Sequence, residues 1–343
     1  MSDRWIVLGE PTRRRWGGDL RRAFIFAELA ARTRAELPTA HRPIRRWWDR
    51  RHARLAAADL LTEEAIALAR GWCRFVALDV HDDPVAQARA FGAVTPAAEI
   101  EAINRRFRAN TDAFEILVAP SGTFAELAGL PAARVVVAPN GTDTRQVVPG
   151  PLPSRPTVGM VSGASPGRGI ERLIEAATIV RERVPDLRLA LWLVASSDSG
   201  RGYLRSLEQA TVDRSWITIA AAPYERLGAQ LSEATVLCVP HPPGDYMDSA
   251  LPVKLFDSMA AGRPLVVTPR TEMAAAVRAA SCGLVSDGDT AEDLAAAVVR
   301  LLLDPSAAQV LGARGRTAAE DVYDWRLIGA HVAEAVLDRI GAW

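Results

Sequence analysis

Short runs of consecutive apolar residues alternate along this chain with longer segments in which apolar residues recur every three or four positions. An uninterrupted apolar run of about four to eight residues is typical of a strand buried on both faces, and a repeat of about 3.6 residues is typical of an amphipathic helix. The alternation occurs twice, before and after about residue 150. It predicts an α/β protein built of two Rossmann-like, doubly wound domains.

The first half begins with the run WIVLG and continues through a turn at Gly17 and Gly18 into a helical pattern. A strand, a glycine turn and a helix are typical of the start of a doubly wound domain. Later runs predict more strands, and the segments between them predict helices. The expected strands cover residues 5–9, 73–80, 114–118 and 134–138, and the expected helices cover 19–32, 85–91, 96–108 and 121–128, with one or two more within 45–70.

The second half restarts the pattern after VVPGPLPSRP at 147–156, whose proline content is typical of a linker. We therefore expect an N-terminal domain over 1–150, a second domain over 151–325, and a last helix within 326–343 that packs back on the first domain. The expected strands cover residues 157–161, 187–194, 216–220, 234–239, 265–268 and 283–285, and the expected helices cover 169–184, 224–233, 251–261, 273–279, 291–303, 306–321 and 325–340.

The segment 240–268 carries the strongest candidate for chemistry. Within it, the expected helix at 251–261 has a proline just inside its start and a glycine just after its end. Lys254 and Asp257 are three residues apart and therefore about 60° apart around this helix. A helix N-terminus with a lysine suits a phosphate, and an acid one turn further suits the hydroxyls of a ribose. These preferences together indicate a nucleotide sugar as the ligand.

The alternative for this pair is an exposed salt bridge that contributes less than about 1 kcal/mol. Composition favours a special role, because Lys254 is the only lysine among the 41 basic residues. A lysine presents a compact charge on a flexible stem, whereas an arginine presents a flat fork.

Two further clusters follow expected strands. The glycine-rich turn GASPGRG at 163–169 lacks the Gly-Lys-Ser/Thr of a nucleoside triphosphate loop and the spacing of a dinucleotide-binding turn. His81 and Asp82 follow the strand at 73–80, at a position where open α/β sheets bind ligands. The structural alternative is that His81 caps a turn and an aspartate caps the helix that begins at Pro84.

PVKLFDSMAAGRPLVVT at 252–268 resembles the signature of the retaining glycosyltransferases of the GT-B fold, family 4, and APNGTD at 138–143 resembles the end of their N-terminal domain. The resemblance implies two Rossmann-like domains that face each other across a cleft. It also implies that the donor sugar is transferred by front-face displacement, with no protein nucleophile and no divalent metal ion.

The resemblance gives individual residues a role. Asp257 is expected to hold the nucleotide ribose, Arg168 the donor diphosphate, and His81 the transferred sugar. Many relatives carry a glutamate where this chain has Ser249. The expected catalytic residues are His81 and Asp82, the donor-binding residues are Arg168, Lys254, Asp257, Ser249, Leu251 and Tyr224, and the residues facing the acceptor and the cleft are Gly17, Gly18 and Asn140.

Composition restricts where such a protein works. The chain has 49% hydrophobic and 24% charged residues with no net charge, which is typical of a soluble globular protein. Its three cysteines are odd in number and lack the spacing of a metal site, which favours a reducing compartment. Neither a secretory signal nor an apolar run of about 18 residues is visible. We therefore expect a cytoplasmic location.

Basic residues are concentrated near the start of the chain. Residues 1–54 carry 14 arginines against 6 acidic residues, and HRPIRRWWDRRHAR at 41–54 adds two tryptophans. This arm predicts either peripheral contact with an anionic membrane surface or acceptor, or a solvated helix face. No motif that reads a nucleic-acid groove accompanies the charge, so a nucleic-acid partner is not expected.

The sequence thus predicts a hexosyltransferase without a cofactor that moves sugar from a UDP-, GDP- or dTDP-sugar to a small-molecule, lipid or glycan acceptor. Two alternatives stay open, a nucleotide-sugar epimerase of the same fold and a catalytically silent scaffold at a membrane. The bias toward arginine and alanine indicates a bacterial source with GC-rich DNA.

Overall fold

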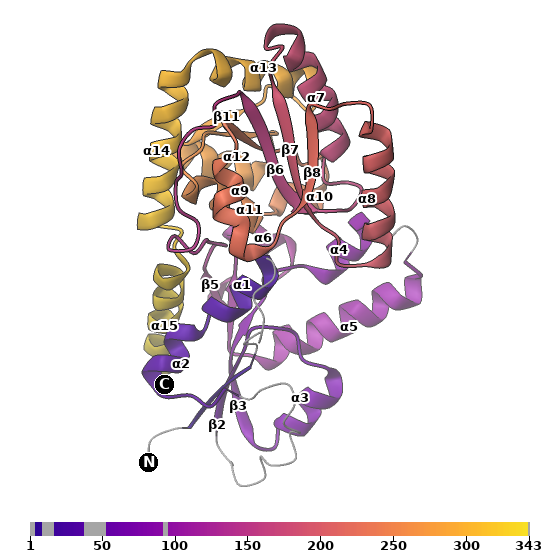
Figure 1. Cartoon of the computed structure of the whole chain (residues 1–343). Coiled ribbons are helices and arrows are strands. Elements are labelled where there is room, and N and C mark those ends of the chain that lie inside the picture. Colours follow the sequence, from indigo (N-terminus) through magenta and orange to yellow (C-terminus); the bar gives the residue numbers. More distant parts are fainter. Residues whose placement is uncertain (1–3, 9–16, 38–52, 92–94, 342–343) are drawn as a thin grey trace. The chain divides into compact units, whose positions relative to one another are not determined.

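The two hydrophobic patterns build two separate parallel sheets, each with helices packed on it, which confirms the predicted α/β class (Figure 1). The computed structural model describes residues 4–8, 17–37, 53–91 and 95–341. Contacts within the chain divide it into two units. Unit 1 comprises residues 1–140 and 325–343, and unit 2 comprises residues 141–324.

Unit 1 contains a five-stranded sheet in the order β1-β2-β3-β4-β5, so that every strand lies beside its neighbour in sequence. The strands are β1 (Trp5–Leu8), β2 (Ala53–Ala57), β3 (Cys73–Asp79), β4 (Ile116–Ala119) and β5 (Val135–Val137). The helices are α1 (Gly17–Phe24), α2 (Ala27–Thr33), α3 (Glu63–Ala69), α4 (Pro84–Phe91), α5 (Ala97–Ala113), α6 (Gly122–Leu127), the 3-10 helix η2 (Ala132–Arg134) and α15 (Trp325–Gly341).

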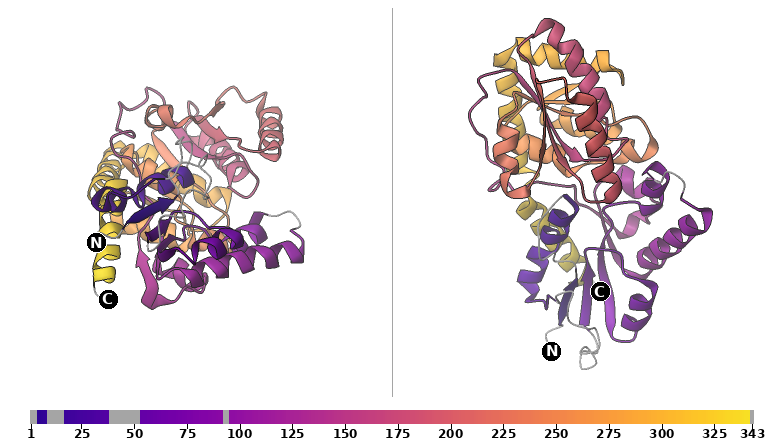
Figure 2. Two further views of the ribbon diagram at one scale, coloured as in Figure 1. Left: turned by 90° about the horizontal axis from the view of Figure 1, so that it is seen from below. Right: turned by 45° about the vertical axis from the view of Figure 1, so that its right-hand side comes forward.

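The last helix, α15, belongs to unit 1 and packs on α1 and α2, and Figures 1 and 2 show it in yellow beside them. The buried ring of Trp325 stacks on Phe24 with the ring centroids 6.3 Å apart. A Cβ atom on Gly329 would lie 2.8 Å from the carbonyl oxygen of Phe24, so this position requires glycine. The chain therefore returns to unit 1 after completing unit 2.

Unit 2 contains a six-stranded sheet in the order β11-β10-β9-β6-β7-β8. The strands are β6 (Thr157–Gly163), β7 (Arg188–Val194), β8 (Ile217–Ala221), β9 (Val236–Val239), β10 (Leu265–Val267) and β11 (Gly283–Val285). The helices are α7 (Ile170–Arg183), α8 (Asp198–Thr211), η3 (Tyr224–Arg226), α9 (Leu227–Ser232), α10 (Asp245–Ser249), α11 (Val253–Ala260), α12 (Thr271–Ala280), α13 (Ala291–Leu303) and α14 (Pro305–Asp321).

The four central strands of the unit 2 sheet, β10, β9, β6 and β7, are buried on both faces. In β7, Leu189 and Leu191 enter the core shared with α7 and α13, whereas Ala190 and Trp192 enter the core shared with α11 and α12. Because successive side chains of a strand point to opposite faces, a strand between two helix layers needs an uninterrupted apolar run. This is why the strands of unit 2 were visible in the sequence.

Several sequence-based expectations for individual elements were wrong. Part of the helical region expected at 45–70 is the strand β2, because its alanine-rich sequence favours a helix locally but lies between two strands of the sheet. The helix expected at 19–32 is two helices, α1 and α2. The helices α8 and α10 were not expected, since the first is mostly polar and the second follows a loop rich in proline and glycine.

The first boundary between the units lies ten residues before the position expected from the proline-rich linker. In the structure the segment from Gly141 belongs to unit 2. There Thr142 pairs with Asp324 as an isolated bridge, and Val147 is fully buried in the core with α11. These contacts hold 141–150 on unit 2.

Within the described residues, no single helix is long and apolar enough to cross a bilayer. The helices α13 and α14 pass the same test only as a pair, with a bend of 101° between them.

Candidate functional site

The helix α11 presents the lysine identified in the sequence. It begins after Pro252, whose fixed φ suits a helix start, and its apolar side is formed by Leu255, Phe256 and Met259, all fully buried. Lys254 lies in the first turn, and its Nζ donates a hydrogen bond to the Oγ of Ser162 at 3.2 Å. This contact joins the start of α11 to the carboxyl end of β6.

The charge of Lys254 is poorly compensated. Burial, together with the positive charge of Arg168, lowers the pKa of Lys254 well below its usual value. Among the described residues no carboxylate forms an ion pair with its ammonium group. An anion bound at this place would therefore restore the charged form of the lysine.

The glycine turn after β6 brings Arg168 to the same place. Gly167 and Gly169 have φ of 77° and 78°, a left-handed conformation that favours glycine. A Cβ atom on Gly169 would lie 1.8 Å from the carbonyl oxygen of Pro240, the first residue after β9. The turn therefore packs directly on the segment that follows β9.

Strand order explains why these segments meet. The chain builds β6, β7 and β8 in one direction across the sheet and then returns to place β9 on the other side of β6. Ligands of open α/β sheets bind outside the carboxyl ends of the strands at such a reversal. The turn at 163–169 follows β6, and the segment leading to α11 follows β9. Lys254 and Arg168 thus belong to the part of unit 2 where a ligand is expected.

Asp257 is one turn further along α11 and only 4% exposed. The hydroxyl of Thr142 donates a hydrogen bond to its Oδ1 at 2.8 Å. Burial raises the pKa of Asp257, the hydrogen bond from Thr142 lowers it, and the negative charge of Asp143 raises it, with a net result of about 7. The carboxylate is therefore held in place as an acceptor at a cost in stability.

The other expected donor-binding residues precede α11 in sequence. Ser249 ends α10 and is buried, and its hydroxyl donates a hydrogen bond to the carbonyl oxygen of Tyr246 at 3.1 Å. Leu251 precedes α11, and Tyr224 begins η3; both are partly buried and pack on the apolar core that contains α11. No side-chain hydrogen bond connects Ser249 to Lys254 or Asp257 among those of the described residues.

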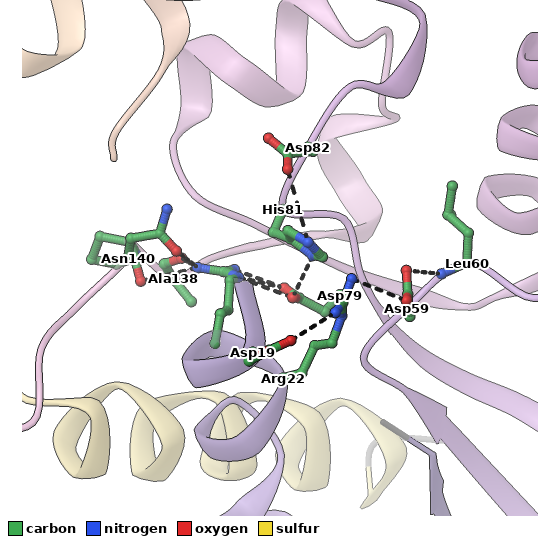
Figure 3. A network of polar contacts seen from close by, with 11 residues as sticks. Asp19, Arg22, Asp59, Leu60, Asp79, His81, Asp82, Ala138 and Asn140 are labelled. Carbon is green, nitrogen blue, oxygen red and sulfur yellow. Dashed lines mark hydrogen bonds and ion pairs between the residues drawn. The ribbon is translucent and has the colours of Figure 1, made fainter. Parts of the chain in front are cut away.

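A second polar cluster lies in unit 1, at the carboxyl end of β3 (Figure 3). Arg21 on α1 and Asp79 at the end of β3 are each 1% exposed and form an ion pair, with Nη2 2.7 Å from Oδ1. Arg21 also donates from Nη1 to the Oδ1 of Asn140 at 3.2 Å and to the carbonyl oxygen of Ala138 at 3.0 Å. One buried arginine thus connects α1, β3 and the end of the segment after β5.

His81 joins this cluster, since its Nδ1 lies 3.1 Å from the Oδ2 of Asp79. Burial lowers the pKa of His81, but the contact with Asp79 outweighs this effect, and the net pKa is raised. The side chain of Asp82 is half-exposed and lies 4.0 Å from the Nε2 of the same ring (Figure 3).

Gly17 and Gly18 form the first residues of α1, one turn before Arg21. Of the arm at 41–54, residues 41–52 lie outside the described residues, and Ala53 and Arg54 belong to β2.

Comparisons with known proteins show what this chain is similar to. Residues 155–304 match the model of the family described as "Glycosyl transferases group 1". The GDP-mannose-dependent alpha-(1-6)-phosphatidylinositol monomannoside mannosyltransferase of Mycolicibacterium smegmatis is 30% identical over 222 residues, which cover 61% of this chain and 58% of the relative. The chain is thus similar to the group 1 glycosyltransferases over residues 155–304. It spans between 49% and 58% of the length of the curated relatives it matches.

Solved structures show that this chain has the GT-B fold. WaaG, a glycosyltransferase involved in lipopolysaccharide biosynthesis, superposes with a TM-score of 0.70 at 14% identity and covers 97% of this chain and 99% of its own. HepE from Anabaena, in complex with UDP-glucose, gives a TM-score of 0.68 at 15% identity, covering 98% of this chain and 99% of its own.

Sequence reasoning missed several residues in the two polar clusters of this chain. Arg21 and Thr142 contact Asp79 and Asp257, which are 58 and 115 residues away, and no local pattern announces such a contact. Ser162 precedes the glycine turn without being part of it. His241 follows β9 in the segment 240–268. The strand order reverses between β6 and β9, and the position of His241 just after one of these strands was the signal that could have identified it.

Proposed function

We propose that this chain is a retaining, metal-independent glycosyltransferase of family 4 that moves a sugar from a nucleotide sugar to an acceptor hydroxyl. The observation that carries the proposal is the placement of Lys254, the only lysine, at the first turn of α11 and in contact with the end of β6. This is where the strand order reverses in a unit whose sequence matches a glycosyltransferase family.

In the proposed mechanism unit 2 holds the donor. The carboxylate of Asp257 accepts hydrogen bonds from the ribose hydroxyls, and Lys254 and Arg168 bind the diphosphate with the N-terminus of α11. The same positive groups stabilise the negative charge that grows on the diphosphate as it leaves. Ser249, Leu251 and Tyr224 are proposed to complete the donor site.

Transfer with retention requires the acceptor to attack on the face from which the diphosphate departs. The bond between the anomeric carbon and the phosphate oxygen breaks, the bond to the acceptor oxygen forms, and the acceptor's proton passes to the departing phosphate oxygen. We propose that His81, fixed through Asp79, contacts the transferred sugar, that Asp82 acts beside it, and that Gly17, Gly18 and Asn140 contribute to the acceptor side.

The relatives suggest which substrates to test first. The mycobacterial relative is named for GDP-mannose and a phosphatidylinositol mannoside, and HepE was solved with UDP-glucose. We therefore propose GDP-mannose as the first donor and a glycolipid as the first acceptor to test. For a lipid acceptor, the location that fits is the cytoplasmic membrane surface, with the arm at 41–54 in contact with anionic lipid.

The experiment is a thermal-shift series with GDP-mannose, UDP-glucose, ADP-glucose and dTDP-glucose, followed by a transfer and hydrolysis assay with the stabilising donor in EDTA. We expect one nucleotide sugar to raise the unfolding temperature and turnover to persist in EDTA. Asp257→Ala should reduce turnover by about tenfold or more, because it removes a charged acceptor. Asp186→Ala, at an exposed aspartate of unit 2, is the matched control.

If the wild-type protein bound none of these nucleotide sugars, the proposal would be wrong. Turnover that disappears in EDTA and returns with a divalent cation would contradict metal independence while leaving transfer intact. Conversion of the nucleotide sugar into its epimer without an acceptor would favour the epimerase alternative.

A further inference from the structure

His241, two residues after the end of β9, is buried without a hydrogen-bond partner on its ring. The side chain has 0% exposure, and neither Nδ1 nor Nε2 has a partner among the described residues. Only its backbone is engaged, since the hydroxyl of Thr268 donates to its carbonyl oxygen at 2.6 Å. Buried polar atoms are paired in nearly all cases, and each exception calls for a ligand or a water molecule.

The charged groups that act on this ring are all positive. Burial lowers the pKa of His241 well below its usual value, and the charges of Lys254, Arg168 and Arg270 lower it further. Arg270 is compensated by two carboxylates, since its Nη1 lies 3.1 Å from Asp248 and its Nη2 lies 2.6 Å from Asp289. Lys254 has the hydroxyl of Ser162 as its hydrogen-bond acceptor. The two nearby carboxylates thus lie on Arg270, and no negative group of the described residues acts on the ring itself.

Three segments converge on this ring. The turn with Arg168 touches Pro240, the residue directly before His241, as the position of Gly169 shows. The start of α11, with Lys254, is joined to the end of β6. The third segment is the one between β10 and α12, in which Arg270 is the last residue before α12. The unpartnered ring thus lies among the residues proposed for the donor diphosphate.

We propose that His241 is a further phosphate-binding residue, which donates a hydrogen bond from a ring nitrogen to a diphosphate oxygen of the nucleotide sugar. The inference rests on the proposed function, because it takes the donor diphosphate as the ligand. A neutral imidazole supplies one N–H donor, and a protonated one supplies two. A bound diphosphate adds negative charge beside the ring and so favours the protonated form. Donor binding is then coupled to proton uptake.

The test compares a nucleotide sugar with its own nucleoside by calorimetric titration: GDP-mannose with guanosine, or UDP-glucose with uridine, according to which sugar the wild-type protein binds. His241→Phe keeps a flat ring without donors, and His241→Gln keeps a donor. His331→Phe, at an exposed histidine on α15, is the matched control. Nucleoside affinity reports whether each variant keeps a folded site.

We expect His241→Phe to weaken nucleotide-sugar binding by about tenfold or more while nucleoside binding is unchanged, because a hydrogen bond to a charged group is lost. His241→Gln should recover most of that affinity, and His331→Phe should behave as wild type. In the wild type, the ratio of nucleotide-sugar to nucleoside affinity should rise from about pH 8 to about pH 6. Asp257 cancels in this ratio, since both ligands contain the ribose. Lys254 does not cancel, because it also faces the diphosphate and has a lowered pKa, so the share of His241 is the part of the rise that His241→Phe loses.

Two outcomes would overturn the inference. If the wild type bound the nucleotide sugar and His241→Phe kept both its affinity ratio and its pH dependence, the histidine would be a packing residue and the proposed function would stand. If the wild type bound no nucleotide sugar at all, the proposed function would fail and the inference with it.

Discussion

Single side chains in unit 2 are held in states that cost stability in the absence of a ligand. Asp257 has its pKa raised to about 7, chiefly by burial, although Thr142 donates a hydrogen bond to it. Lys254 and His241 have lowered pKa values, also chiefly because they are buried. Buried ionisable groups with shifted pKa values cluster at functional sites, which favours a binding role for this part of unit 2.

Asp257→Asn should stabilise the protein at alkaline pH. A carboxyl group whose pKa is 3.8 when unfolded and about 7 when folded makes the native state lose stability as pH rises between these values. Asparagine does not ionise and still accepts the hydrogen bond from Thr142. We expect a gain of up to roughly 4 kcal/mol in the free energy of unfolding at about pH 8, shrinking as pH approaches about 4.

Urea unfolding at the two ends of this pH range measures the effect, with Asp186→Asn as the exposed control. Nucleotide-sugar affinity should fall in the same Asp257 variant, so stability and binding move in opposite directions. An Asp257→Asn protein that is less stable than wild type at alkaline pH would contradict the raised pKa.

Among the elements, the turn between β6 and α7 determines how close Arg168 comes to the segment after β9. Its Gly169 has a left-handed φ of 78° and leaves no room for a Cβ atom beside Pro240. By contrast, a Cβ atom on Gly163 would meet nothing within 4 Å. Gly169 is therefore the position for a substitution, and Gly163, at the end of β6, is the position for its matched control.

Gly169→Ala should push the turn away from Pro240, the residue after β9, and so displace Arg168. We expect a loss of about 2 kcal/mol or more in the free energy of unfolding, from the strained φ and the overlap with Pro240, and a weaker affinity for the nucleotide sugar. Gly163→Ala should change both quantities little. Chemical denaturation and titration of the two variants check this, and equal behaviour of the two would refute the close approach.

The sequence predicted elements best where burial imposes one pattern. The strands of unit 2 were found because both faces are covered, and α11 was found because a proline and a glycine mark its ends. The strand β2 was missed because ARLAA favours a helix until β1 and β3 flank it. The placement of Lys254 and Asp257 on one helix could be predicted from their spacing. The contacts of Asp257 with Thr142 and of Arg21 with Asp79 depend on the tertiary fold and could not.

For the whole molecule, the two clusters of candidate residues lie on different units. Lys254, Arg168, Asp257 and His241 belong to unit 2, whereas His81 belongs to unit 1 with Asp79 and Arg21. We propose that unit 2 binds the donor and that His81 takes part in sugar transfer. Substitutions should therefore separate the two functions: Lys254 variants should lose the donor, and His81 variants should keep it but transfer slowly.

The most direct test of the central claim is calorimetric titration of the donor nucleotide sugar into the wild type, Lys254→Met and His81→Ala. We expect Lys254→Met to raise the dissociation constant by about tenfold or more, since it removes the ammonium group from the diphosphate, and His81→Ala to stay within about twofold of wild type. Wild-type affinity in Lys254→Met would contradict the claim that this lysine binds the donor.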